Sequence, residues 1–443
     1  DFSSMDVTTA IIERIHEHDG RLLSYARTME QDALETAQRL DDARSAGEPM
    51  GALHGVPIAI KDLLYTRGIP TASGTKVMAD YIPDEDATVV TRLKEAGAVI
   101  VGKTQMTEGA WSMHHPDIPA PVNPWHDEYW TGVSSSGTGV ATAAGLCFAA
   151  LGTDTAGSIR FPSACCGLVG LKPTFGRVSK AGAFVLADSL DHIGPLTRSV
   201  ADAALMLQVL AGFDPADPNS VNAPVPDYLD SLKDGVNGFK IGLDKKYVDC
   251  AMDPAVVENI ERVSAVFKKL GAELIEIEMP DHHGLVEGSG VTVGAEVAMA
   301  HQAYYPEKKA LYGPGLSDLL DGGLAASAVQ YAGMERQREA FRAGVNQLFE
   351  QVDMLLNPAM IVSVPDLNAM DVAVADLEVL QNFITYTVPF NYSGHPALTM
   401  PTGLDSNGLP QSFQLIGPML GEAKLLQAGY AFEEVAGFKE HPM

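Results

Sequence analysis

Cysteine is scarce in this sequence of 443 residues, which contains only Cys147, Cys165, Cys166 and Cys250. Four cysteines at irregular spacing are too few for a disulfide framework and do not match the ligand pattern of a zinc site. We therefore expect all four to be reduced and buried, because a free thiol packs like a small apolar side chain.

Positive charge is also in short supply, since 30 Lys and Arg residues face 57 Asp and Glu residues, a net charge of −27. Such a surface repels phosphate backbones and anionic lipids, which argues against nucleic acid and membranes as partners. The longest run of small apolar residues, 137–152, is too short and too rich in Gly, Ala and Thr to span a bilayer. No signal peptide is visible, so we expect a cytoplasmic protein, although the first residue is Asp1 and a removed leader stays open.

Several common catalytic motifs are missing. The chain has neither a G-x-S-x-G elbow nor an H-E-x-x-H zinc motif. Residues 97–104, GAVIVGKT, fit the phosphate-loop pattern, but a helix is predicted before them and Ala98, Val99, Ile100 and Val101 favour a strand. The histidines at 114, 115 and 126 lack matching carboxylate or Cys spacing. We expect no metal and no cofactor.

The apolar residues alternate between strand and helix periodicity along most of the chain. Strands are predicted at 56–60, 98–101, 240–243 and 272–277, and helices at 88–95, 138–150, 200–210, 254–270 and 422–436. Two helices are expected within residues 7–46, on either side of a turn at 22–28. Such alternation predicts one α/β domain over residues 1–443, with a mostly parallel sheet covered by helices on both faces. Residues 1–50 pack on it, and the more helical segment 282–375 is expected to cap a site.

The strongest chemical signal lies in two segments rich in small and hydroxylated residues. Ser134, Ser135 and Ser136 form one, and Ser158 lies in LGTDTAGSIRFPS, residues 151–163. Lys61 follows the apolar stretch 56–60, where burial could keep it neutral enough to act as a base for a serine. Two other interpretations stay open at this point, a solvated Lys61 paired with Asp62 and a flexible serine loop.

These residues stand within longer blocks that resemble the amidase signature family of serine hydrolases. The blocks are TGVSSSGTGVATAAG, LGTDTAGSIRFPSACCGLVGLKPTFGRVS, HGVPIAIKDL, AGAVIVGKTQMTE, NPW, NYSGHPALTMPTG and GLPQSFQLIG. They keep this order over nearly the whole chain. The resemblance implies the amidase signature fold, a single large α/β/α domain with a mixed, mostly parallel twisted sheet.

The resemblance also assigns catalytic roles. It implies a Ser-cisSer-Lys triad in which Lys61 is the base, Ser134 the bridging serine after a cis peptide at Val133, and Ser158 the nucleophile. An acyl-enzyme would form without metal or cofactor. The implied oxyanion hole consists of the backbone N–H groups of Thr155, Ala156, Gly157 and Ser158. Arg160 and Asp154 are expected to support this loop rather than to take part in the chemistry.

Substrate contacts are expected from Trp111, Gly132 and Val133, with Val133 and Ala156 replacing glycines that are usual in the family. A second wall is expected from residues 284–331. Tyr304, Tyr305 and Tyr312 could line a site that accepts an aromatic group, but we favour a place in the core or at the surface.

The leading hypothesis is a stand-alone amidase, monomeric or homodimeric, acting on small neutral aryl or alkyl amides. Carbamate (urethane) and ester substrates stay open. The alternative is the glutamine-hydrolysing subunit of a transamidation complex, against which Phe161 argues because the resemblance implies a glutamine there. An inactive binding protein on the same scaffold is disfavoured because all three triad positions are filled.

Overall fold

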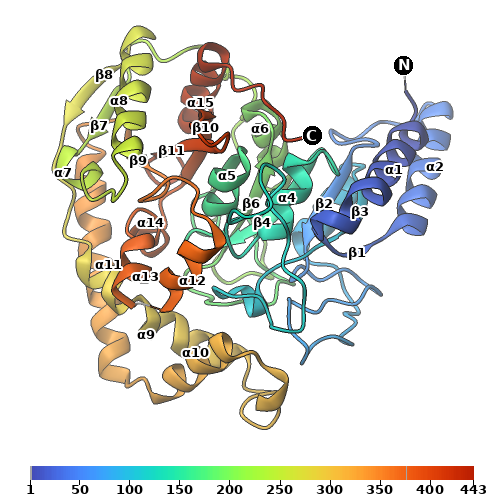
Figure 1. Cartoon of the computed structure of the whole chain (residues 1–443). Coiled ribbons are helices and arrows are strands. Elements are labelled where there is room, and N and C mark those ends of the chain that lie inside the picture. The colour runs from blue at the N-terminus through green and yellow to red at the C-terminus, as the bar shows by residue number, and fades with distance from the viewer. Residues whose placement is uncertain (1, 376) are drawn as a thin grey trace.

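A computed structural model describes residues 2–375 and 377–443. Its centre is an eleven-stranded sheet in the order β1-β3-β2-β4-β6-β5-β10-β11-β9-β7-β8 (Figure 1). The strands are β1 (Tyr25–Thr28), β2 (Pro57–Lys61), β3 (Val99–Thr104), β4 (Ala149–Asp154), β5 (Val169–Lys172), β6 (His192–Thr197), β7 (Lys240–Leu243), β8 (Glu273–Glu276), β9 (Met354–Pro358), β10 (Ala397–Leu404) and β11 (Pro410–Ile416).

Helices surround this sheet in the described part of the chain. They are α1 (Ser4–Leu22), α2 (Glu30–Ser45), α3 (Thr88–Glu95), α4 (Ser136–Ala143), α5 (Arg160–Cys166), α6 (Val200–Leu210), α7 (Lys245–Val248), α8 (Pro254–Lys269), α9 (His283–Ala300), α10 (Pro314–Ala325), α11 (Ala328–Leu348), α12 (Leu367–Ala375), α13 (Leu377–Phe383), α14 (Val388–Ser393) and α15 (Glu422–Ala436), with short 3-10 turns η1 (Glu108–Ala110) and η2 (Lys309–Leu311).

The sheet is mixed, as expected, but parallel pairs do not dominate it. Of its ten neighbouring pairs, β3/β2, β2/β4, β9/β7 and β7/β8 are parallel and the other six are antiparallel. Strands β10 and β11 are antiparallel because a short hairpin across residues 405–409 joins them without a helical crossover. The alternation of strands and helices therefore predicted the parallel pairing in the two flanks of the sheet but not the antiparallel pairing in its centre.

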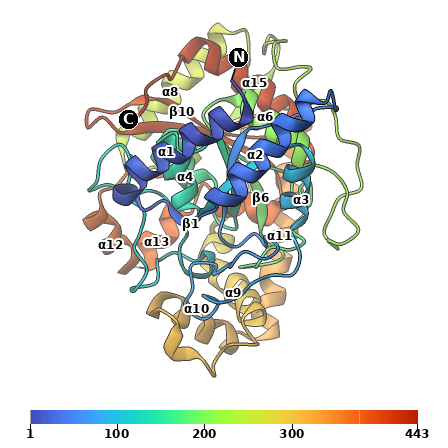
Figure 2. The same cartoon turned by 90° about the vertical axis from the view of Figure 1, so that its right-hand side faces the viewer.

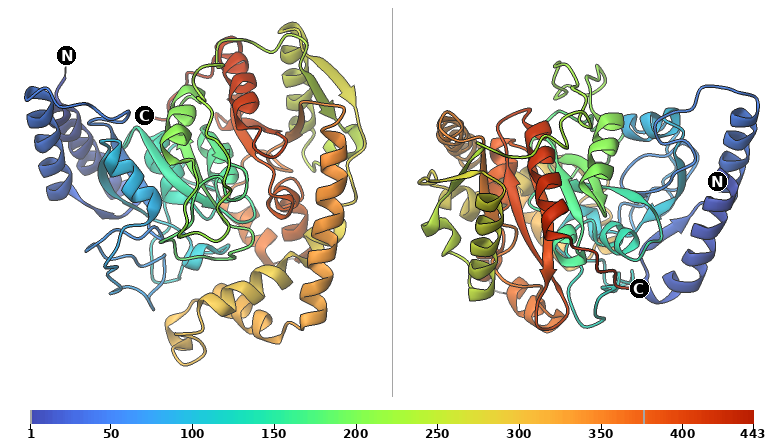
Figure 3. Two further views of the ribbon diagram at one scale, coloured as in Figure 1. Left: turned by 180° about the vertical axis from the view of Figure 1, so that it is seen from behind. Right: turned by 90° about the horizontal axis from the view of Figure 1, so that it is seen from above.

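The central strands are buried on both faces, and their side chains alternate between two cores. Ile58 and Ile60 of β2 join the core that contains α3, α6, α8 and α15, whereas Ala59 joins the core that contains α1, α2 and α4. In β3, Ile100 joins the first of these cores and Val99 joins the second. Figure 2 shows α1 and α2 against their side of the sheet, and Figure 3 shows them and α8 at opposite ends of the molecule.

Most predicted elements are confirmed, and α3, α6 and α15 begin and end at the predicted residues. The helix predicted over 138–150 is wrong at its end: α4 stops at Ala143, Gly145 takes a left-handed φ of +69°, and β4 begins at Ala149. A run of small apolar residues cannot distinguish a buried helix from a buried strand by periodicity. The turn expected at 22–28 contains the short strand β1, which pairs with β3.

The phosphate-loop match at 97–104 is part of a strand, as expected. Residues 99–104 form the fully buried β3. Lys103 donates to the carbonyl of Leu64 at 2.9 Å and to the hydroxyl of Thr71, so its ammonium group is used inside the protein.

All four cysteines are free thiols, and Cys147, Cys165 and Cys166 are buried as expected. The expectation is wrong for Cys250, which is exposed just after α7.

Helices α9 and α10 lie below the sheet in Figures 1 and 2, α11 runs up beside it in Figure 1, and strand β9 within the segment 282–375 returns to the sheet. One buried carboxylate links this region to the core. Gly313 N, at the start of α10, donates to both carboxylate oxygens of Glu108 at 3.0 Å. Burial raises the pKa of Glu108 to about 7, although the bonds from Gly313 oppose this rise.

The raised pKa of Glu108 predicts a pH-dependent contribution to stability. Because the folded protein binds this proton more tightly than the unfolded chain, the contribution is full below pH 4.5 and is lost as the pH rises through about 7. Relative to Glu108→Gln, wild-type protein should lose on the order of 1–3 kcal/mol of unfolding free energy between these pH values. Urea denaturation of both proteins at several pH values measures this, and a pH-independent difference would contradict it.

Candidate active site

Lys61 ends β2 and is completely buried. Its Nζ donates to Ser134 Oγ at 2.7 Å and to Thr153 Oγ1 at 2.8 Å. Burial lowers the pKa of Lys61 to about 7, and the negative charges of Asp191 and Asp154 limit that fall. The lysine therefore has a substantial neutral fraction near pH 7. It is not a solvated partner of Asp62, whose carboxylate pairs with Lys103 at 3.3 Å.

The serine tract 134–136 is buried, and each of its side chains has a different partner. Ser134 follows a cis peptide bond after Val133 and accepts from Lys61. Ser135 Oγ donates to the carbonyl of Thr153 at 3.2 Å, and Ser136 Oγ lies 3.2 Å from His114 Nε2. Only Ser134 thus contacts the lysine, and the tract is not a flexible loop.

Ser158 lies in the turn between β4 and α5, with 8% of its surface exposed. Thr155, Ala156 and Ser158 all line a cavity of about 560 Å³. Gly157 has φ +129°, and a Cβ there would lie 2.4 Å from the Phe161 ring, so the turn requires glycine.

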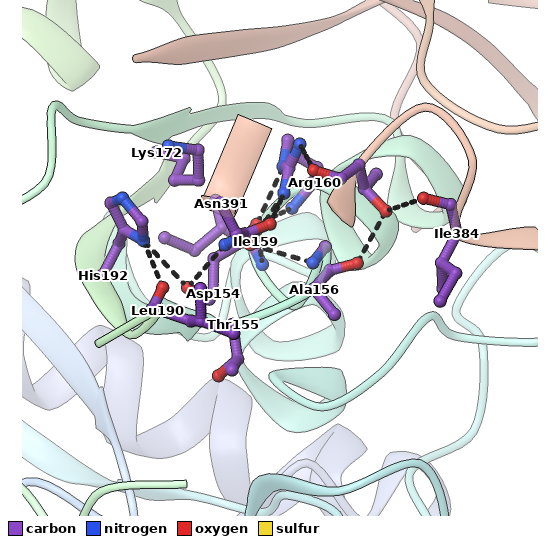
Figure 4. A network of polar contacts seen from close by, with 12 residues as sticks. Asp154, Thr155, Ala156, Ile159, Arg160, Lys172, Leu190, His192, Ile384 and Asn391 are labelled. Atoms are coloured by element: carbon purple, nitrogen blue, oxygen red, sulfur yellow. Dashed lines mark hydrogen bonds and ion pairs between the residues drawn. The ribbon is translucent and has the colours of Figure 1, made fainter. Parts of the chain in front are cut away.

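A buried ion pair fixes this turn from beneath (Figure 4). Arg160 binds both carboxylate oxygens of Asp154, at 2.9 and 3.0 Å, and also the Thr387 carbonyl and Asn391 Oδ1. Burial alone would raise the pKa of Asp154, but the Arg160 charge holds that pKa well below its usual range. The pair acts on the backbone, as expected, and burial rather than Arg160 lowers the pKa of Lys61.

Asp154 also uses one of the four amides expected in the oxyanion hole. Gly157 N donates to Asp154 Oδ1 at 2.8 Å, so this N–H points at the carboxylate beneath the turn. The expectation for Gly157 is therefore not met in this structure. Within residues 2–375 and 377–443, the amides of Thr155, Ala156 and Ser158 have no hydrogen-bond acceptor.

The cavity in front of Ser158 is mostly apolar. Its walls come from the loop after β3, the Trp130–Val133 segment, α9, α10, the start of α11, and α12 to α14. The side chains lining it include Ala110, Trp111, Trp130, Val133, Phe161, Leu186, Leu190, Val291, Val293, Leu319, Met370, Leu380, Phe383, Ile384, Val388 and Tyr392. Trp111, Val133 and the expected wall within 284–331 are thus present in the lining.

Gly132 does not line this cavity, contrary to expectation. It lies behind the wall, where a Cβ would be 2.4 Å from Pro162 N, so its φ of +75° and its close approach serve packing. Tyr304, Tyr305 and Tyr312 are also absent from the lining, as expected. Tyr305 and Tyr312 are buried in the core instead.

Sequence reasoning missed several residues around the site. Thr153 contacts Lys61, and Asp191 accepts from Thr155 Oγ1 at 2.5 Å. The rings of Trp130, Phe161 and Phe383 pack at 5.5–6.0 Å and form an aromatic wall. Thr153 lies within the quoted segment 151–163 and could have been noticed there, but nothing near Phe383 in the sequence indicates its distant partners.

Two further findings concern the described residues 2–375 and 377–443. No group of three or more His, Cys, Asp or Glu side chains among them is placed to hold a metal ion. None of their helices combines the length and apolar character needed to cross a membrane.

Comparisons with known proteins identify the family of this chain. The sequence model of the Amidase family matches residues 6–426. "Putative amidase AmiD" of Mycobacterium tuberculosis is 42% identical over 436 residues, covering 98% of this chain and 91% of that protein. A glutamyl-tRNA(Gln) amidotransferase subunit of Moorella thermoacetica is 39% identical, covering 98% and 93%. The structure of native peptide amidase from Stenotrophomonas maltophilia superposes with a TM-score of 0.85 at 28% identity, covering 100% and 95%.

The chain belongs to the amidase signature family. It is a hydrolase that acts on amides.

Breaking the buried Asp154–Arg160 ion pair should destabilise the folded protein. Arg160→Met leaves the buried carboxylate without its cation, which should lower the unfolding free energy by about 3–5 kcal/mol. Lys76→Met removes an ion pair of 2.6 Å to Asp117 whose partners are 43% and 64% exposed, and it should cost less than about 1 kcal/mol. Urea denaturation followed by circular dichroism compares the two variants. Equal losses would show that burial of the pair is not what stabilises this turn.

Proposed function

We propose that this protein is a stand-alone amidase that hydrolyses amides with apolar aryl or alkyl groups through Lys61, Ser134 and Ser158. The observation that carries the proposal is the buried Lys61, with a pKa of about 7, bonded to Ser134 beside a cavity lined by Ser158. A lysine with that pKa can accept a serine proton at neutral pH, whereas a solvated lysine stays protonated.

In the proposed acylation step, Lys61 Nζ takes the proton of Ser134 Oγ, which takes that of Ser158 Oγ. Ser158 Oγ then forms a bond to the substrate carbonyl carbon. When the tetrahedral intermediate collapses, the C–N bond breaks and the proton returns through Ser134 to the leaving amine. A water molecule next attacks the acyl-enzyme, which releases the carboxylic acid and restores Ser158.

The negative charge on the carbonyl oxygen needs hydrogen-bond donors during both steps. The amides of Thr155, Ala156 and Ser158 fit this role because they lie at the cavity and have no other acceptor among the described residues. Such donors contribute roughly 3 kcal/mol each to transition-state stabilisation. Gly157 is left out of the proposed oxyanion hole because its amide binds Asp154.

The second candidate function is glutamine hydrolysis within a transamidation complex, as the name of the Moorella thermoacetica relative suggests. Free glutamine carries an α-carboxylate, which proteins bind with Arg or Lys. No Arg or Lys lines the cavity among the described residues, and its walls are largely aromatic and aliphatic. This lining favours the stand-alone amidase. Activity on carbamates and esters, and the monomeric or dimeric state, stay predictions.

Substitution of the proposed nucleophile tests the proposal directly. Ser158→Ala should reduce kcat on p-nitroanilides at least about 10³-fold, because no acyl-enzyme can form. Ser406→Ala, in the exposed turn between β10 and β11, should leave the rate unchanged. The panel adds p-nitrophenyl esters, aryl carbamates and glutamine. Wild-type hydrolysis of glutamine but of no anilide would move the assignment to the transamidation complex.

The pH dependence of the rate tests the role of Lys61. Since neutral lysine is the active form, kcat/KM should rise with pH through an apparent pKa of about 7. Asp191 is the largest charge that raises the pKa of Lys61, so Asp191→Asn should move this rise to lower pH, whatever it does to kcat. Asp188→Asn, a half-exposed carboxylate in the same loop, should leave the rise in place. An unchanged profile in Asp191→Asn argues against Lys61 as the titrating group.

A further inference from the structure

Glu287 is the only acidic side chain among the described residues that line the cavity, and no basic side chain accompanies it. The other polar side chains that α9, α11 and α13 contribute to the lining are neutral, namely Ser289, Gln330 and Gln381. A single carboxylate on an otherwise uncharged wall gives the cavity lining a negative charge. The proposed mechanism uses no charge at this position.

Glu287 is held in place through its backbone rather than its side chain. It is the fifth residue of α9, and its carbonyl accepts from Gln381 Nε2 of α13 at 3.1 Å. Within residues 2–375 and 377–443, its carboxylate makes no hydrogen bond or ion pair. The side chain is exposed, so a ligand in the cavity can reach it.

The charge of the whole molecule acts in the same direction. With a net charge of −27, the protein as a whole carries a negative potential. Low-dielectric walls focus such a field into a cleft, which attracts cations and repels anions. A cavity of about 560 Å³ lined by aromatic and aliphatic groups accommodates an apolar body of drug-like size.

We propose that Glu287 is a specificity-determining residue that selects amides carrying a protonated amine on an apolar aryl or alkyl body. This inference rests on the proposed function and narrows its substrate class. It differs from the prediction made from the sequence, which was a neutral substrate. The apolar body would occupy the cavity beside Ser158, and the ammonium group would lie at the α9 wall against the Glu287 carboxylate.

Ligand binding tests the charge selection without catalysis. The probes are 4-phenylbutylamine, 4-phenylbutanol and 4-phenylbutanoate, which share one apolar body and differ in charge. Calorimetry with Ser158→Ala protein at pH 7 and low salt should show the amine binding roughly five-fold more tightly than the alcohol, and the carboxylate more weakly. In 0.5 M NaCl the preference should shrink, because salt screens an exposed carboxylate.

Variants assign the preference to one residue. In Ser158→Ala protein, the additional substitution Glu287→Gln should lower the affinity for the amine to that for the alcohol. The additional substitution Glu287→Lys should make the carboxylate the preferred ligand. Glu339→Gln, an exposed position on α11 outside the cavity, makes the same change in net charge and should keep the preference. Equal binding of amine and alcohol, or a preference that survives Glu287→Gln, overturns the inference.

Hydrolysis separates this inference from the proposed function. Wild-type protein should cleave 6-aminohexanoyl p-nitroanilide with a higher kcat/KM than its uncharged heptanoyl counterpart, and Glu287→Gln should equalise the two. If neither anilide is cleaved while the amine still binds through Glu287, the proposed function fails and the charge selection stands. If both are cleaved at a ratio that Glu287→Gln does not change, the charge selection fails and the amidase stands.

Discussion

The bond between Asp154 and Arg160 is the interaction on which the geometry of the site depends. Asp154 ends β4, and its carboxylate accepts from the amides of Gly157, Ile159 and Arg160, so the whole turn folds around one buried charge. The Arg160 guanidinium extends this network to the Thr387 carbonyl and to Asn391 of α14. A segment more than 200 residues away is thereby joined to the turn that presents Ser158, and both are positioned by the same pair of charges.

Burial has two consequences in this protein that are hard to separate. The strands β2, β3 and β4 lie between two apolar cores, which stabilises the sheet. The same surroundings remove water from Lys61 and favour its neutral form. The proposed base is therefore not activated by a neighbouring cation. Its chemistry derives from its position at the end of a central strand, with Ser134 and Thr153 as its only side-chain hydrogen-bond partners in the described part of the chain.

The sequence predicted the parts of the fold and site that depend on local pattern. Helices α3, α6 and α15 carry clear periodicity, and the motif around Ser158 carries its small residues within one short stretch. What it could not predict depends on contacts between distant segments. The direction of β6 relative to β4 is one such feature, and the Phe383 wall is another. The use of the Gly157 amide by Asp154 depends on torsion angles that residue types leave open.

The cavity is assembled from two kinds of structure. The floor around Ser158 belongs to segments attached to central strands, whereas the far wall belongs to α9, α10 and α13, which lie outside the sheet. Substitutions in that outer wall can alter which molecules enter without disturbing the hydrogen bonds beneath the floor. A protein built this way can acquire new substrates through changes in a peripheral layer, while the part that performs the reaction stays the same.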